Sequence, residues 1–384
     1  MTTERAPAGA AGETETAGPR LCQARAAVAE TAVRARHLRR VWWLPGTTLG
    51  VAGWPSVPNQ RLHGHWNYWW QAHLLDCLVD AQLRVPSPDR GRLIGRLVRG
   101  VRLRNLGSWT NDYYDDIAWL GLALLRASAA TGIPVDDAVA PIVAQLRAGW
   151  TDHAGGGVWW RRNDTFKNVP ANGPAAILLA RWSRAGGERA DLQRARSITQ
   201  WMDSTLVDED TGLLWDGLYT NEDGTVGEIV TTIYTYCQGV FLGACLELAP
   251  GDSSGVWLVR AERTVDAIAA GVARDGVLVG QGGGDGGLFA GILARYLALA
   301  ALVMPALGAV GAGGLAANLV LSSADAAWRN RAVARGGPLF GPSWDTPAQV
   351  PRPRRAAGAE RDLSVQLSGW MVLEAAALLE RGRR

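Results

Sequence analysis

The sequence of 384 residues has little lysine, cysteine and histidine, and these shortages narrow its possible chemistry. Lys167 is the only lysine, and the glycine-dense stretch 280–287 contains none, which argues against a phosphate-binding loop there. The four cysteines show no C-x-x-C or Cys/His spacing. His63 and His65 have no third ligand placed near them, so we expect neither a metal site nor a cofactor.

Charge and hydropathy exclude two further classes of partner. The formal net charge of +3 is nearly balanced and no dense basic block occurs, so we expect no nucleic-acid partner. The longest apolar stretch, 296–321, is interrupted by Pro305 and by four glycines. This pattern predicts a buried helix, a loop and a second helix instead of a transmembrane segment.

Residues 1–20 are rich in small and polar residues and lack the basic and then apolar pattern of a signal peptide. We expect a disordered segment there. On that ground we expect a cytoplasmic protein, or a secreted one if the natural start lies elsewhere. We also expect a monomer.

Helical periodicity is abundant. Apolar residues recur with a period of about 3.6 along the chain, and glycine and proline residues separate the segments. Short connections alternate with long ones rich in glycine and tryptophan. This pattern suits a single all-α domain over residues 21–384, an (α/α)6 barrel of six helical hairpins, while periodicity alone also allows an α-solenoid or two bundles. The expected helices cover about 22–38, 64–83, 87–103, 112–130, 134–149, 169–185, 188–205, 232–249, 254–273, 286–303, 310–331 and 361–382.

One aromatic stretch contains the candidate catalytic residues. Asp115 and Asp116 follow Tyr113 and Tyr114 and open an apolar run. Acidic residues are common in the first turn of any helix, and Asp112 is a candidate N-cap. Crowded carboxylates, however, raise one another's pKa, and a glycosidase needs one protonated and one ionised carboxyl group at the same bond. We therefore interpret Asp115 and Asp116 as a catalytic pair that meets the substrate at the start of the helix.

Further aromatic and polar clusters are predicted to bind the substrate. The chain has 18 tryptophans, and indole rings make good platforms for the apolar faces of sugars. Lys167 and the asparagines near it are predicted to bond sugar hydroxyls. Each cluster also has a purely structural interpretation, as packed rings in a loop or at a helix start. The predicted substrate-binding residues are Trp66, Asn67, Asp112, Tyr113, Tyr114, Trp159, Trp160, Lys167, Asn168, Asn172, Asp216, Tyr236 and Gln238.

Several of these segments, in order, resemble glycoside hydrolase family 76, the bacterial and fungal α-1,6-mannanases. The resemblance implies an (α/α)6 barrel and retaining hydrolysis of α-1,6-linked mannosyl chains. If the catalytic roles of the family apply to the matching positions, Asp115 would be the nucleophile and Asp116 the general acid/base, with carboxyl groups about 5–5.5 Å apart. The substrate would be an α-mannan. The matching stretches are 65–72 (HWNYWWQA), 111–119 (NDYYDDIAW), 156–160 (GGVWW), 166–168 (FKN), 216–217 (DG), 235–239 (TYCQG), 289–296 (FAGILARY) and 364–366 (SVQ).

Two positions depart from the family pattern. Cys237 stands where the family commonly has asparagine, and Ala290 where it commonly has lysine. A thiol cannot replace the paired donors and acceptors of an amide, so we expect altered contacts near Gln238. Two other functions stay open: a catalytically silent glycan-binding protein on the same scaffold, and a related toroid enzyme that acts on another sugar, including an epimerase or a lyase.

Overall fold

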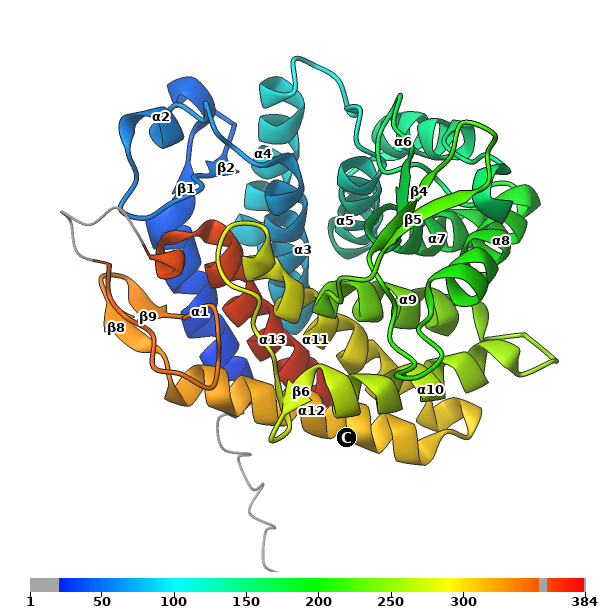
Figure 1. Ribbon diagram of the computed structural model, residues 1–384. Coiled ribbons are helices and arrows are strands. Elements are labelled where there is room, and N and C mark those ends of the chain that lie inside the picture. Colours follow the sequence, from blue (N-terminus) through cyan, green and yellow to red (C-terminus); the bar gives the residue numbers. More distant parts are fainter. Residues whose placement is uncertain (1–20, 352–357, 383–384) are drawn as a thin grey trace, which may run out of the picture.

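Six inner helices form a closed ring in the computed structural model, which describes residues 21–351 and 358–382 (Figure 1). Each inner helix packs on the next one along the chain, and the last, α13, packs on the first, α3. Every inner helix has an outer partner, and the predicted (α/α)6 barrel is confirmed. The inner helices are α3 (Tyr68–Arg84), α5 (Tyr114–Thr131), α7 (Val169–Arg184), α9 (Thr235–Leu248), α11 (Gly286–Val303) and α13 (Leu363–Gly382).

The N-terminal helix completes the outer layer by packing on α13. The expected disordered segment, residues 1–20, lies outside the described residues. A short thirteenth helix, α2 (Pro58–Arg61), was not predicted and lies in the connection before α3. The outer helices are α1 (Leu21–His37), α4 (Pro88–Arg104), α6 (Asp136–Ala148), α8 (Arg189–Leu206), α10 (Val256–Gly271) and α12 (Val310–Arg329).

Burial explains why the two layers differ in sequence. An inner helix contacts two inner neighbours and one outer helix, so apolar and small side chains occupy nearly every face of α9 and α11. The approach can be very close: a Cβ atom at Gly291 of α11 would lie 2.6 Å from the Cα of Ser368 on α13, so only glycine fits there. Outer helices such as α4 and α8 bury one face and expose arginines on the other.

Within the described residues, one helical stretch, Gly286–Leu307, is long and apolar enough to cross a membrane. In the ring, 72% of its most apolar window is buried, because α9, α12 and α13 pack against it. The helix, turn and second helix predicted for 296–321 are observed: α11 ends at Val303, the 3-10 turn η3 (Pro305–Leu307) follows, and α12 begins at Val310.

Short antiparallel strands lie in the long connections and were not predicted. They form one three-stranded sheet and three two-stranded ones within residues 21–351 and 358–382. Runs of two to five residues are too short for an alternating pattern to be recognised. The strands are β1 (Leu38–Arg39) with β2 (Leu49–Gly50), β3 (Phe166–Asn168) with β4 (Gly217–Thr220) and β5 (Val226–Val230), β6 (Ala273–Arg274) with β7 (Val277–Leu278), and β8 (Ala332–Ala334) with β9 (Gly337–Leu339).

The long connections all run from an outer helix to the next inner helix, so they gather where the inner helices begin. We call this end of the ring the loop face. Away from it, acidic and basic side chains cross the interior of the ring. Asp76 and Asp80 of α3 each form ion pairs with Arg126 of α5 and Arg295 of α11. These ion pairs tie three inner helices together below the loop face.

Four inner helices hold the preceding connection with the same side-chain device. An amide at the fourth residue of the helix accepts from the backbone N–H of one loop residue and donates to its C=O, as a neighbouring strand would. All four amides are fully buried, so breaking either bond would leave a buried polar group unsatisfied. The pairs are Gln71 with Gly50, Asn172 with Val158, Gln238 with Leu214, and Gln366 with Phe340.

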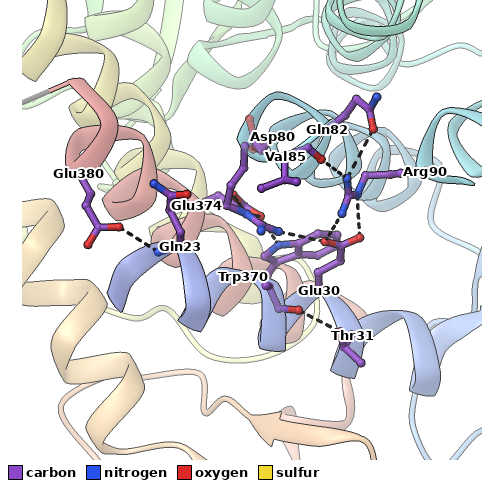
Figure 2. Close-up of polar contacts among 12 residues, drawn as sticks. Gln23, Glu30, Thr31, Asp80, Gln82, Val85, Arg90, Trp370, Glu374 and Glu380 are labelled. Carbon is purple, nitrogen blue, oxygen red and sulfur yellow. Dashed lines mark hydrogen bonds and ion pairs between the residues drawn. The ribbon is translucent and has the colours of Figure 1, made fainter. Parts of the chain in front are cut away.

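Buried charges attach α1 to three other helices (Figure 2). Glu30 of α1 lies 2.8 Å from Arg90 of α4 and 3.0 Å from Arg84 of α3. Arg84 also binds Glu374 of α13 at 3.0 Å, and Trp370 donates to Glu374 at 2.9 Å. Burial raises the pKa of Glu30, but the surrounding arginines lower it more, and the net shift is downward. Burial dominates at Glu374 and raises its pKa to about 7.

Candidate active site

Asp115 and Asp116 lie in the first turn of α5, on the loop face. The helix begins at Tyr114, whose N–H donates to the carbonyl of Trp160 at 2.9 Å. Asp112, the candidate N-cap, does not cap the helix. Tyr113 occupies the N-cap position, no side chain among the described residues caps the helix, and Asp112 is exposed, 3.9 Å from Arg162.

The two adjacent carboxylates have different partners. Asp115 is held at both oxygens: Oδ1 accepts from the N–H of Asp116 at 2.8 Å, and Oδ2 accepts from Nε1–H of Trp160 at 3.0 Å. Asp116 accepts one hydrogen bond, from Nδ2 of Asn111 at 2.7 Å. Donors aimed at a carboxylate favour its ionised form. The hydrogen bonds therefore favour the ionised form of Asp115 more than that of Asp116.

Burial raises the pKa of both carboxyl groups. It raises the pKa of Asp115 to about 6, although the donors to its oxygens oppose the shift. Burial and then the charge of Asp115 raise the pKa of Asp116 well above its ordinary value. The charge on an ionised Asp115 thus opposes the ionisation of Asp116.

Two more carboxylates reach the same region from distant segments. Asp285, directly before α11, accepts from the indole N–H groups of Trp69 at 3.0 Å and Trp70 at 2.8 Å, and its charge raises the pKa of both Asp115 and Asp116. Asp216 precedes α9. Burial raises its pKa to about 7, and the nearby charge of Asp115 adds to the shift.

Asp285 was missed because residues 280–287 were considered only as a phosphate loop. The sequence does contain a signal for it. An aspartate directly before an apolar helical run is the same feature that identified Asp115 and Asp116. In a ring whose inner helices all begin on the loop face, acidic residues at those starts converge.

Asp216 has a buried Oδ1 atom with no hydrogen-bond partner among the described residues.

Aromatic rings from three inner helices form a wall beside these acids. Tyr236 of α9 stacks on Phe289 of α11 with ring centroids 4.0 Å apart, and Tyr234 meets the same ring at 5.3 Å. Trp69 of α3 lies 6.3 Å from Tyr236 and 6.4 Å from Phe289. Trp69 and Phe289 belong to the matched sequence segments but were not predicted as site residues. Such a wall presents apolar ring faces of the kind that sugars stack on.

Tyr113 and Trp160 form a second aromatic contact beside Asp115. Their rings meet edge to face at 5.2 Å, and the guanidinium of Arg161 lies over both. Trp160 also bonds Asp115 directly. The structure thus brings these two predicted residues to the Asp115–Asp116 pair.

Lys167 is not available to a sugar, which corrects the prediction that it bonds sugar hydroxyls. Its side chain is fully buried and Nζ donates to three backbone carbonyls, those of Thr151 at 3.0 Å, His153 at 2.7 Å and Gly156 at 2.5 Å. An ammonium has three N–H groups, and all are used. Burial lowers its pKa to about 8. The single lysine therefore shapes the loop that precedes α7.

We expect Lys167→Met to lower the free energy of unfolding by about 3 kcal/mol, because three buried carbonyls lose their donor. Denaturant titration would measure this loss, with Arg196→Met on the exposed face of α8 as the control. KM for a mannooligosaccharide should change little. A large rise in KM without loss of stability would instead mean that Lys167 binds the substrate.

Three predicted amides also have structural roles. Asn172 and Gln238 are two of the four loop-holding amides, and both N–H bonds of each amide are used within the protein. Neither has exposed surface, so the prediction that they contact the substrate directly is wrong. Asn168 is nearly buried and caps α7 by accepting from the N–H of Ala171 at 3.2 Å.

The remaining predicted residues have other contacts. Tyr114 and Trp159 line a surface pocket together with Gln145 and Arg162. Trp66 lies under the guanidinium of Arg104, 5.2 Å away, and Asn67 occupies the N-cap position of α3.

The structure also places the two departures from the family pattern and the two histidines that the sequence analysis considered. Cys237 is fully buried in α9, and burial raises the pKa of its thiol well above the ordinary value, with a further contribution from Asp216. Ala290 is buried in α11. His63 is buried and His65 is exposed. In the part of the chain that the structure describes, no group of three or more His, Cys, Asp or Glu residues is arranged to hold a metal.

Known proteins share the fold of this chain. The α-1,6-mannanase GH76A from Salegentibacter sp. HEL1_6 has a TM-score of 0.81 and 31% identity, over 93% of this chain and 99% of that chain. An inactive variant of that mannanase, with two consecutive aspartates replaced by asparagine, is known in complex with α-1,6-mannotriose. The Lin0763 protein from Listeria innocua has a TM-score of 0.79 and 28% identity, over 94% of this chain and 98% of that chain. A search of curated proteins gives no match. The family model of glycosyl hydrolase family 76 matches residues 26–376, so this chain belongs to that family and is a glycoside hydrolase.

Proposed function

We propose that the protein is a retaining hydrolase of α-1,6-mannosidic linkages, with Asp115 as the nucleophile and Asp116 as the general acid/base. The observation that carries the proposal is the unequal environment of two adjacent carboxyl groups: Asp115 is held by two N–H donors, and burial and the charge of Asp115 raise the pKa of Asp116. The loss of activity in a related α-1,6-mannanase whose consecutive aspartates are replaced supports the same pair.

The reaction has two steps. Asp115 attacks C1 of the mannosyl unit while Asp116 gives its proton to the departing O6 of the next sugar, which leaves a glycosyl ester on Asp115. Water then attacks C1, Asp116 takes the water proton, and the bond to Asp115 breaks. The N–H donors from Trp160 and Asp116 hold the Asp115 carboxylate for attack.

A linear α-1,6-mannan ladder with NMR detection of the first product tests this function. We expect release of reducing ends with the α-anomer formed first. Formation of the β-anomer would exclude retention. Binding of the ladder without release of reducing ends would favour a silent glycan-binding protein.

The pH profile offers a second test. We expect kcat/KM to rise as Asp115 ionises and to fall as Asp116 loses its proton. Because the charge of Asp285 raises the pKa of both groups, Asp285→Asn should move both limbs to lower pH. The asparagine oxygen can still accept from Trp69 and Trp70. Asp275→Asn, an exposed aspartate in the same connection, is the matched control, and equal profiles for the two variants would contradict the assignment.

A further inference from the structure

Charge is unevenly distributed along the chain and over the molecule. The stretches 31–75 and 81–111 contain twelve arginines and one acidic residue, Asp89, although the whole chain has a formal charge of only +3. Several of these arginines are exposed and form no ion pair with any carboxylate in residues 21–351 and 358–382. They are Arg39, Arg40, Arg61, Arg96, Arg99 and Arg102.

The connection between α1 and α3 displays apolar side chains among these charges. In the 3-10 turn η1 (Val41–Trp43), Trp43 is 72% exposed and Trp42 is 38% exposed, and the next residue, Leu44, is 44% exposed. Both tryptophans have left-handed backbone conformations, with φ of 46° and 61°. That conformation is unfavourable for bulky side chains. The turn therefore holds its rings at the surface at a conformational cost.

Hydrogen bonds connect this turn to its neighbours. Nε1 of Trp42 donates to the carbonyl of Leu62 at 2.9 Å, and Arg104 donates to the carbonyl of His63 at 2.7 Å. Leu62 is 44% exposed, and Leu106, two residues beyond Arg104, is 90% exposed. The result is one exposed surface, which we call the Trp43 patch and define as Trp42, Trp43, Leu44, Leu62 and Leu106 with the six unpaired arginines.

The basic face of α4 borders the same turn. Arg99 donates to the carbonyl of Gly46 at 2.9 Å, and the N–H of Thr48 donates to the carbonyl of Arg96 at 3.1 Å. The connections before α3 and α5 carry the apolar part of the patch, so it lies on the loop face, the end of the ring where Asp115 and Asp116 also lie. Figure 1 shows the first of these connections, with β1, β2 and α2, beside α4.

Exposed indoles and leucines beside unpaired arginines match one kind of surface. Tryptophan prefers the interface between lipid headgroups and acyl chains, and arginines are attracted to anionic headgroups. Sugar sites usually place carboxylate or amide acceptors for the hydroxyl protons beside such rings, and the patch as defined contains neither group. We propose that the Trp43 patch docks the protein on an anionic lipid bilayer, and that the mannan it cleaves is attached to such a bilayer. The second half rests on the proposed function.

Flotation of the full chain with lipid vesicles tests the docking. We expect at least about tenfold more protein with phosphatidylcholine vesicles that contain phosphatidylglycerol than with phosphatidylcholine alone, and release at high salt. Trp43→Ser and Arg96→Glu should each lower binding several-fold. The matched controls are Val259→Ser, 63% exposed on α10, and Arg196→Glu, exposed on α8, and both should bind as the unaltered chain does.

Equal binding to both kinds of vesicle, or equal loss in the patch and control variants, would overturn the docking. Binding to duplex DNA without binding to vesicles would overturn it as well. Hydrolysis separates the two halves of the proposal: Trp43→Ser should slow cleavage of a mannan anchored in vesicles and leave cleavage of soluble mannan unchanged. Equal slowing on both substrates would refute the anchored substrate. Vesicle binding by a chain that cleaves no mannan would support docking and refute only the proposed function.

Discussion

Asp115→Asn is expected to lower kcat/KM on linear α-1,6-mannan by about 10⁴-fold, because the amide cannot form the glycosyl ester. Steady-state release of reducing ends measures the loss. The fold should persist, since Nδ2 and Oδ1 of asparagine fill the same volume, and far-ultraviolet circular dichroism would check this. If Asp115→Asn kept most of its activity, another residue would have to be the nucleophile.

Asp116→Asn should lower kcat/KM on the same polymer by about 10²–10⁴-fold. The rate of the first step should fall much less on an aryl mannoside, because a good leaving group needs no proton. Azide separates the roles further. Azide should restore activity to Asp116→Asn and give an α-mannosyl azide as the product. It should also restore activity to Asp115→Ala, which lacks the nucleophile, and there the product should be a β-mannosyl azide. Products of the opposite configurations would exchange the two assignments.

Asp112→Asn is the matched control for both variants. It is the third aspartate of the same stretch, but it is exposed and faces Arg162. We expect activity close to that of the unaltered chain. A loss as large as that of Asp116→Asn would make Asp112 a member of the catalytic set.

Glu30→Ala should lower the free energy of unfolding by about 3–5 kcal/mol, the largest stability effect that we expect. The change leaves Arg84 and Arg90 buried with one carboxylate fewer, and it loosens α1, which completes the outer layer. Urea titration would measure the loss. Glu209→Ala, an exposed glutamate in a loop, should stay within about 0.5 kcal/mol.

The Glu30 effect should also depend on pH in a defined direction. Its pKa is lowered in the folded protein, so the charged pair stabilises the fold above the ordinary pKa of a glutamate and loses that effect as pH falls through the lowered pKa. The stability difference between the unaltered chain and Glu30→Gln should therefore shrink in acid. A difference that grows as pH falls would contradict the ion-pair role.

Sequence reasoning located most of the fold because each helix follows from a local period. The twelve ring helices were anticipated from apolar spacing, and their ends were displaced by a few residues; α3, for example, begins at Tyr68 instead of near residue 64. The short strands and α2 were missed because their length is below any recognisable period. The buried helix–turn–helix of 296–321 was recognised because proline and glycine interrupt its apolar run.

The candidate site was predicted less evenly, for a physical reason. Asp115 and Asp116 could be singled out because their neighbours in sequence are also their neighbours in space. Lys167, Asn172 and Gln238 looked like sugar-binding groups, but burial turned each into a support for a loop. A polar side chain near an aromatic residue has the same sequence signature in both roles, and only its partners distinguish them.

By itself, the sequence determined the helical hairpins, the acidic pair at one helix start and the resemblance to family 76. Only the tertiary structure decided which distant residues meet that pair. Asp285 and Trp69 reach it from α11 and α3, because ring closure brings all inner helix starts to one face. The helical period is set over a few residues, whereas that convergence depends on packing between segments hundreds of residues apart in the chain.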